Sequence, residues 1–110
     1  ELHGTDDDVT LWGGDLENQD GWGAYMDIDS IIALWTGLNG LDQLETTDLP
    51  DIEPADGSTV VFDRHWSGST ENEVWLYRVE GGGHDWPGAW GNRDIQASEE
   101  VWRFFSQYVD

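Results

Sequence analysis

A histidine and a carboxylate, two side chains that cooperate in acid–base chemistry, each stand at the expected end of a strand. His84 follows Gly81-Gly82-Gly83, which close the apolar run of residues 74–79. Glycine permits positive φ and tight turns, so this stretch predicts a loop that presents the imidazole at a strand end. Such loops often carry catalytic or ligand-binding groups, because the sheet positions them. The structural alternative is a Gly-rich turn whose histidine only caps a neighbouring group.

Three adjacent carboxylates, Asp6, Asp7 and Asp8, lie in the loop after His3-Gly4. One of them could orient the imidazole of His84 and stabilise its protonated form while the imidazole takes a proton from a serine. In α/β-hydrolases these groups follow the chain order Ser, Asp, His, and here the acid precedes the histidine. A calcium site is the weaker alternative, since the loop lacks the alternating ligand spacing and the glycine of an EF-hand.

A helix is predicted over residues 29–39, because apolar side chains recur there at i, i+3, i+4 and i+7. These side chains are Ile31, Leu34, Trp35 and Leu38. Asp27, Asp29 or Ser30 can cap its first turn, and Gly40 supplies the left-handed residue after its end. The helix is expected to pack through this stripe on an apolar surface.

A second helix is predicted over residues 94–109, with Asp94 as its cap. Its second half is very apolar, with Trp102, Phe104 and Phe105, which predicts burial against a sheet. Between the two helices, residues 41–58 are acidic, contain two prolines and show no sustained period. This segment is expected to form a surface loop, and its length suggests that the loop has a functional role.

Two strands are expected over residues 59–62 and 73–79, joined through a turn at residues 67–70. The second strand is polar only at Arg78 between residues 74 and 79, which is typical of a strand covered on both faces. Helices on both sides imply an α/β sheet. Eight tryptophans favour another possibility, a small carbohydrate-binding module, but such modules are usually all-β sandwiches.

The composition describes one small, strongly acidic domain over residues 1–110. With 24 Asp and Glu against 4 Arg, the formal net charge is −20. Nucleic acid and anionic membrane surfaces are therefore unsuitable partners, since both are bound through cations. Self-repulsion on this scale destabilises a compact state in dilute buffer, so we expect adaptation to high salt or to a marine setting. No cysteine is present, which excludes disulfides and thiolate chemistry.

At this point the sequence resembles the C-terminal half of the polyhydroxybutyrate depolymerase and feruloyl esterase group of α/β-hydrolases. The resemblance covers nearly the whole chain, and its most specific part surrounds His84. The motifs are His3-Gly4-Thr5-x-Asp7, Trp12-Gly13-Gly14, Trp35 with Asn39-Gly40, Gly81-Gly82-Gly83-His84-x-Trp86-Pro87-Gly88, Ile95-x-Ala97 and Trp102-x-Phe104-Phe105. The group often has a cysteine after Asn-Gly, where this chain has Leu41.

The resemblance implies a secreted or periplasmic serine esterase that acts on polyesters or plant-wall phenolic esters without a cofactor or metal. Asp7 would be the acid of its Ser-His-Asp triad and His84 the general base. Trp86 and Trp90 flank the histidine and could wall the substrate. The implied fold is the C-terminal portion of an α/β-hydrolase, a mostly parallel sheet flanked by helices. An α/β-hydrolase type of serine peptidase is the alternative enzyme.

The sequence contains no G-x-S-x-G motif, and Ser67 and Ser69 lie in a turn between strands rather than in a strand-to-helix elbow. The nucleophile and oxyanion donors are therefore expected upstream of Glu1. The isolated piece should be inactive, and it should need the missing N-terminal half of the fold or self-associate through an open sheet edge.

Overall fold

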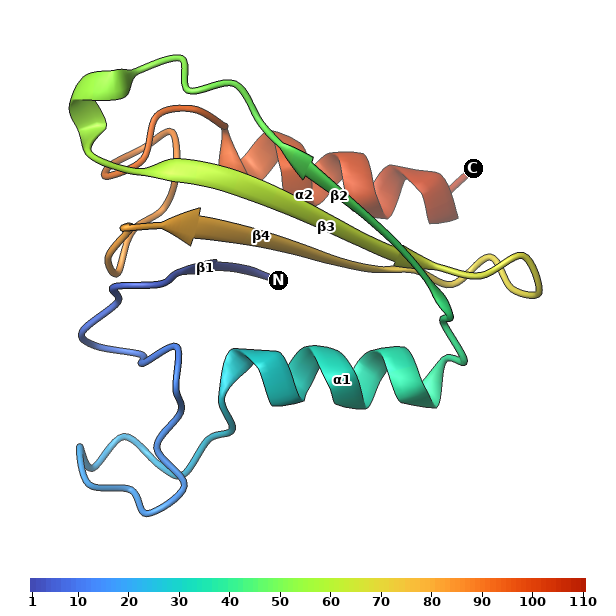
Figure 1. Cartoon of the computed structure of the whole chain (residues 1–110), viewed down its shortest axis with the longest axis horizontal. Coiled ribbons are helices and arrows are strands. Elements are labelled where there is room, and N and C mark those ends of the chain that lie inside the picture. The colour runs from blue at the N-terminus through green and yellow to red at the C-terminus, as the bar shows by residue number, and fades with distance from the viewer.

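The computed structural model describes residues 1–110 as a four-stranded sheet with a helix on either side (Figure 1). The strands are β1 (Leu2–Gly4), β2 (Gln43–Asp48), β3 (Thr59–Trp66) and β4 (Val74–Glu80). The helices are α1 (Ile28–Leu38) and α2 (Ala97–Phe105), and two short 3₁₀ helices, Pro54–Asp56 and Ser106–Tyr108, complete the elements. The sheet has the order β1-β4-β3-β2, which makes β4 a central strand and β1 and β2 its edges.

Only one pair of neighbouring strands is parallel, so the expectation of a mostly parallel sheet is wrong for this chain. β1 pairs with β4 in parallel, and Leu2 lies opposite Tyr77. β2, β3 and β4 form an antiparallel meander. The cause is the short connections between these three strands, because a parallel pair needs a long crossover. The crossover from β1 to β4 contains α1, β2 and β3.

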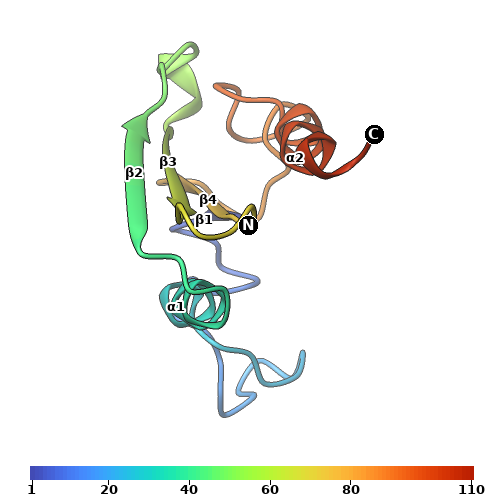
Figure 2. The same cartoon turned by 90° about the vertical axis from the view of Figure 1, so that its right-hand side faces the viewer.

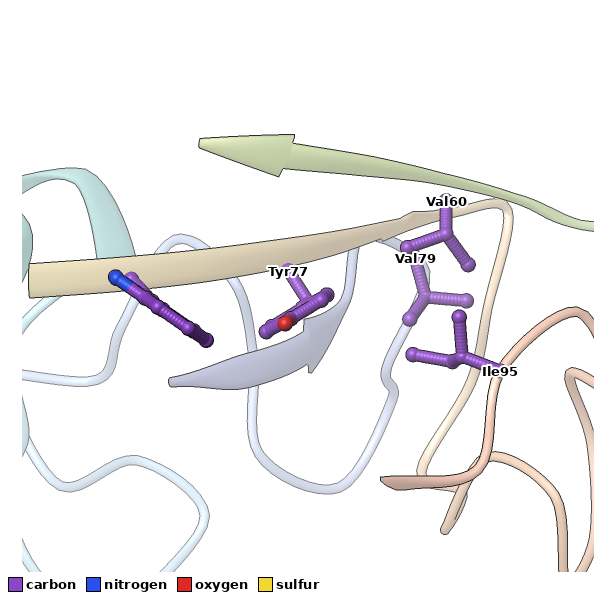
Figure 3. Packing of buried hydrophobic residues seen from close by; sticks show 5 residues of the cluster. Val60, Tyr77, Val79 and Ile95 are labelled. Carbon is purple, nitrogen blue, oxygen red and sulfur yellow. The ribbon is translucent and has the colours of Figure 1, made fainter. Parts of the chain in front are cut away.

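The two faces of β4 are both buried, as its apolar sequence predicted. Trp75, Tyr77 and Val79 face the side of α2, where they pack with Val60 of β3 and Ile95. Figure 3 shows Val60, Val79 and Ile95 gathered on this face, with Tyr77 beside them. On the opposite face Leu76 packs with α1, through Ile28 and Ile32. The view along the sheet in Figure 2 accordingly places α1 and α2 on opposite sides.

Helix α1 forms close to the predicted residues but buries a different stripe. Asp27 is its N-cap, with its carboxylate accepting a hydrogen bond from the Ser30 N–H, which decides among the three candidate caps. Ile28 and Ile32 are buried, whereas the predicted contact residues Leu34, Trp35 and Leu38 are 46, 52 and 69% exposed. The apolar surface of this small sheet lies under the first half of the helix, so the second half of the predicted stripe has no partner.

Helix α2 begins three residues later than predicted, and Asp94 is not its cap. The Asp94 carboxylate instead accepts hydrogen bonds from the Glu53 N–H and from the side chain of Asn92, which ties two loops together. Phe104 packs edge-on against Trp75 of β4. Trp102 and Phe105 remain exposed, so burial of the whole apolar half was a wrong prediction.

Residues 41–58 contain a strand where only a loop was predicted. Every residue of β2 is exposed, and the strand is held by its backbone pairing with β3 and by a hydrogen bond from the Thr46 hydroxyl to Asp63. The result is a mixed α/β domain, which differs from the all-β sandwich that carbohydrate-binding modules usually adopt. Neither helix has the length and apolar character needed to cross a membrane.

Candidate functional site

The loops that follow β1 and β4 meet at the carboxyl ends of these two strands, because parallel neighbouring strands end on the same side of a sheet. The backbone of Thr5 donates to the carbonyl of Val79, and that of Asp6 donates to the carbonyl of Gly82. The Thr5 hydroxyl accepts from the N–H of Gly81. Residues far apart in the sequence are thereby fixed side by side.

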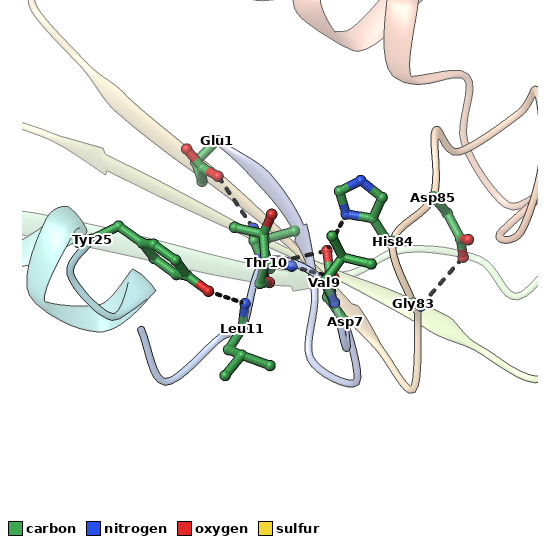
Figure 4. A network of polar contacts seen from close by, with 10 residues as sticks. Glu1, Asp7, Val9, Thr10, Leu11, Tyr25, Gly83, His84 and Asp85 are labelled. Carbon is green, nitrogen blue, oxygen red and sulfur yellow. Dashed lines mark hydrogen bonds and ion pairs between the residues drawn. The ribbon is translucent and has the colours of Figure 1, made fainter. Parts of the chain in front are cut away.

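Asp7 and His84 form the centre of this loop junction. Nδ1 of His84 lies 3.0 Å from Oδ2 of Asp7 (Figure 4). The other carboxylate oxygen, Oδ1, accepts from the backbone N–H groups of Val9 and Thr10, each at 2.8 Å. One carboxylate oxygen is therefore held by the backbone, which fixes the carboxylate. The other contacts the imidazole and orients it.

The surroundings of Asp7 keep its carboxylate ionised. Burial alone would raise the pKa of Asp7, but the N–H groups of Val9 and Thr10, with His84, hold that pKa below its usual value. Asp7 is 8% exposed, while Asp6 and Asp8 are exposed. The structure thus brings the middle carboxylate of the three to the histidine, the same one that the family motif indicated.

The tautomer of His84 follows from its partner. An ionised carboxylate only accepts hydrogen bonds, so Nδ1 carries the proton that is donated to Asp7. In the neutral ring Nε2 is then unprotonated and can accept a proton. The side chain of His84 is 56% exposed, so this nitrogen is open to a reacting group. Chemically, the pair has the arrangement of an oriented general base.

His3, the second histidine near Asp7, contacts both the Asp7 loop and the first residue of the chain. Its Nε2 is 2.7 Å from the carbonyl oxygen of Thr10, and the same nitrogen is 3.7 Å from Oδ2 of Asp7. Nδ1 lies 3.5 Å from the carboxylate of Glu1. The sequence signal that could have identified these contacts is the spacing of four residues between His3 and Asp7 across a tight turn.

Trp86 and Trp90, the predicted substrate walls, are paired with each other in an isolated antiparallel bridge. They are 42 and 57% exposed, and the Trp86 indole N–H donates to the Ser98 hydroxyl of α2. Asp85 accepts from the N–H of Gly83 and does not contact His84. The two tryptophans therefore form an exposed aromatic surface on the segment that follows His84.

None of the six serines in the chain hydrogen-bonds to His84. Ser67 and Ser69 contact each other in the turn before β4, whereas His84 follows the far end of that strand. Seven strand residues separate the two ends by roughly 20 Å. No group of three or more metal-ligating side chains occurs in the structure, including the acidic loop of Asp6 and Asp8.

An apolar cavity of the domain is separate from the acid–histidine pair. It measures about 610 Å³ and forms an apolar groove beside β1, between the two helices. Its lining includes Leu2, Trp35, Val74, Trp75 and Phe105. β1 is an edge strand of the sheet, and the backbone pairing of residues 1–4 with β4 reaches back only to Trp75, so the start of β4 has no neighbouring strand at this edge. We call this cavity the edge groove.

Comparison with known proteins gives no match for this chain among protein families, curated proteins or solved structures.

Proposed function

We propose that this domain supplies the acid and the general base of a serine esterase with an α/β-hydrolase fold. The observation that carries the proposal is the contact between Asp7 and His84, which join at the ends of adjacent parallel strands. The buried acid is fixed by two backbone donors, and the partly exposed histidine leaves Nε2 available. These are the features that a histidine base needs.

In the proposed reaction, Nε2 of His84 takes the proton of a serine hydroxyl as the serine oxygen attacks the ester carbonyl. Asp7 stabilises the imidazolium that forms. The imidazolium then gives this proton to the leaving alcohol as the ester C–O bond breaks, which leaves an acyl-serine. Water, activated by the same histidine, hydrolyses the acyl-serine and restores the hydroxyl.

The nucleophilic serine and the oxyanion donors come from outside these 110 residues in this proposal, since no serine of the chain contacts His84. The edge groove is where the remaining part of the hydrolase sheet would pack, because β1 is an edge strand of the sheet there. The sequence resemblance supports polyesters or plant-wall phenolic esters as substrates. It also supports a secreted or periplasmic location.

The test is activity-based labelling of the polypeptide that carries this chain in its source cells. A fluorophosphonate probe should label one serine of that polypeptide, outside the 110 residues, and p-nitrophenyl esters should be hydrolysed faster than matching amide substrates. Label on a polypeptide that cleaves amides faster would favour the peptidase alternative. A polypeptide that takes no label and hydrolyses no ester would contradict the proposal.

Two variants of the same polypeptide make the assignment specific. His84→Gln should abolish turnover, because glutamine cannot take up the serine proton. Asp8→Asn is the matched control, since Asp8 carries the same charge one residue from Asp7 but is exposed and makes no contact with His84. Equal activity in the His84→Gln variant and the parent would contradict the role of His84.

A further inference from the structure

The buried imidazole of His3 has an acceptor at each nitrogen. Nε2 lies 2.7 Å from the carbonyl oxygen of Thr10, which only accepts hydrogen bonds. Nδ1 faces the carboxylate of Glu1 at 3.5 Å. A neutral ring can donate from one nitrogen only and would direct a lone pair at the other acceptor. Protonation at both nitrogens satisfies both contacts.

We propose that His3 is a buried positioning residue of the site, an imidazolium that clamps the Asp7 loop through Thr10 and acts as a second cation beside Asp7. This inference rests on the proposed function, because it concerns the same acid–histidine pair. It assigns a role in the site to His3, a residue outside the Asp7–His84 pair. Asp7 then lies between two histidines, with His84 at 3.0 Å and His3 at 3.7 Å from its Oδ2.

The clamp acts through the turn that holds Asp7. The N–H of Thr10 donates to Asp7, and the carbonyl of the same residue accepts from His3. The N–H and the C=O of Thr10 therefore both help to hold the turn. The ring of His3 also packs edge-on against Trp12, with 5.8 Å between ring centroids. The side chain is 8% exposed, so water screens its charge poorly.

The charges around His3 favour the cation. Glu1 acts most strongly and, with the Thr10 carbonyl and Asp7, raises the pKa of His3 against the effect of burial. The nearest other charges include the Glu1 amino group, which donates to the carbonyl of Trp75. On β4, Arg78 is in register with His3.

The charge of Arg78 is itself offset. The guanidinium of Arg78 binds Asp63 and Glu80. Asp6 and Asp8 in the neighbouring loop are exposed. Glu1 and Asp7 therefore remain the two carboxylates within 4 Å of the His3 ring.

The test is ¹⁵N NMR of the histidine rings in the 110-residue chain, which needs no esterase activity. Both ring nitrogens of His3 should stay protonated to a higher pH than those of His65, a half-buried histidine of β3 whose pKa burial lowers. Glu1→Gln and Asp7→Asn should each shift the His3 titration to lower pH, by on the order of half a unit. A neutral His3 at pH 6, or a titration that neither variant moves, would overturn the proposal.

A second pair of variants, made in the source polypeptide without the probe, separates the effect of the His3 charge from that of its hydrogen bond. His3→Gln keeps an N–H donor for the Thr10 carbonyl but loses the charge, whereas His3→Ala loses both. His3→Gln should keep the fold and move the acid limb of kcat/KM to higher pH by about half a unit, because Asp7 then directs its whole charge toward His84. An unchanged pH profile in His3→Gln would leave only a structural role and would overturn the charge assignment.

The two proposals fail in different ways. If no esterase is found, the NMR titration still decides whether His3 is a cation beside Asp7. If the esterase is found but His3 titrates as an ordinary neutral imidazole, only the further inference is lost. His65→Gln is the control in the kinetic assay, since His65 makes no contact with Asp7 or His84 and its replacement should leave the pH profile unchanged.

Discussion

Gly4 and Gly82 approach so closely that a Cβ atom at position 4 would lie 2.3 Å from the carbonyl oxygen of Gly82. The same atom would lie 2.5 Å from the carbonyl oxygen of Gly83. These are backbone atoms of the loop that carries His84, so they cannot move aside as a flexible side chain would. The absence of a side chain at Gly4 is what allows the acid loop and the histidine loop to lie side by side.

Gly4→Ala should therefore destabilise the domain by about 2–3 kcal/mol, because the methyl group forces the two loops apart. The measurement is urea unfolding of the chain. Gly13→Ala is the matched control, since a Cβ at position 13 meets nothing within 4 Å and should change the unfolding free energy by less than about 0.5 kcal/mol. Equal midpoints for the two variants would contradict this account of the junction.

The contact between an acid of the first loop and His84 was predictable because it depends on where two strands end, and not on the packing of individual side chains. Glycines and polar residues marked two strand ends, and two parallel strands end on the same side of a sheet. The sequence alone left Asp6, Asp7 and Asp8 equivalent until the family motif was added. The choice among them depends on turn geometry, since only Asp7 receives the N–H groups of Val9 and Thr10.

Other parts of the fold were not predictable, for identifiable physical reasons. β2 is exposed on both faces, so its sequence carries no apolar alternation and only its pairing with β3 reveals it. The stripe of α1 was placed wrongly because a helix with many apolar residues offers more than one stripe. The small sheet covers Ile28 and Ile32, and Trp35 is left to line the edge groove.

Asp7→Asn should lower kcat of the source polypeptide on p-nitrophenyl esters by on the order of 10⁴-fold, with little change in KM. The asparagine amide presents an N–H to Nδ1 of His84, which moves the ring proton to Nε2 and prevents proton uptake from serine. The Asp8→Asn control should retain full activity. A loss of equal size in both variants would show that charge in the loop, and not the contact with His84, matters.

Asp7 should also make stability depend on pH in acid. Its folded pKa lies below the unfolded value of about 3.9, so its contribution is complete above that value and is lost as pH falls through the folded pKa. Between pH 5 and 2, the unfolding free energy of the parent should fall more steeply than that of Asp7→Asn. Parallel curves for the two proteins, measured by urea unfolding, would contradict the lowered pKa.

Salt should stabilise the domain, because 24 carboxylates face only four arginines. At 1 M salt the Debye length is about 3 Å, against about 10 Å at 0.1 M, so repulsion among exposed acids is largely removed. The Tm should rise steadily with NaCl between these concentrations. Replacing three exposed acids, Glu17, Asp20 and Asp29, by their amides should reduce the size of this rise. A Tm that does not depend on NaCl would contradict the role of self-repulsion.

The edge groove should drive self-association of the isolated chain once salt has screened its charge. Trp35 and Phe105 line the groove and are 52 and 55% exposed, so two copies can bury apolar surface there while the open edge of β1 finds a partner. At 1 M NaCl, analytical ultracentrifugation should detect association of the parent at micromolar concentration. It should detect only monomer for Trp35→Glu combined with Phe105→Glu.

Trp22→Glu is the matched control for this prediction. Trp22 is 76% exposed but lies on the loop between β1 and α1, away from the groove lining, so its replacement puts a negative charge on an exposed tryptophan without touching the edge. This variant should associate as the parent does. If Trp22→Glu abolished association as fully as the groove variant, general apolar exposure and not the open edge would be the cause. If the groove variant still associated, the contact between copies would lie on another face, and β2, the other exposed edge strand, would be the next surface to substitute.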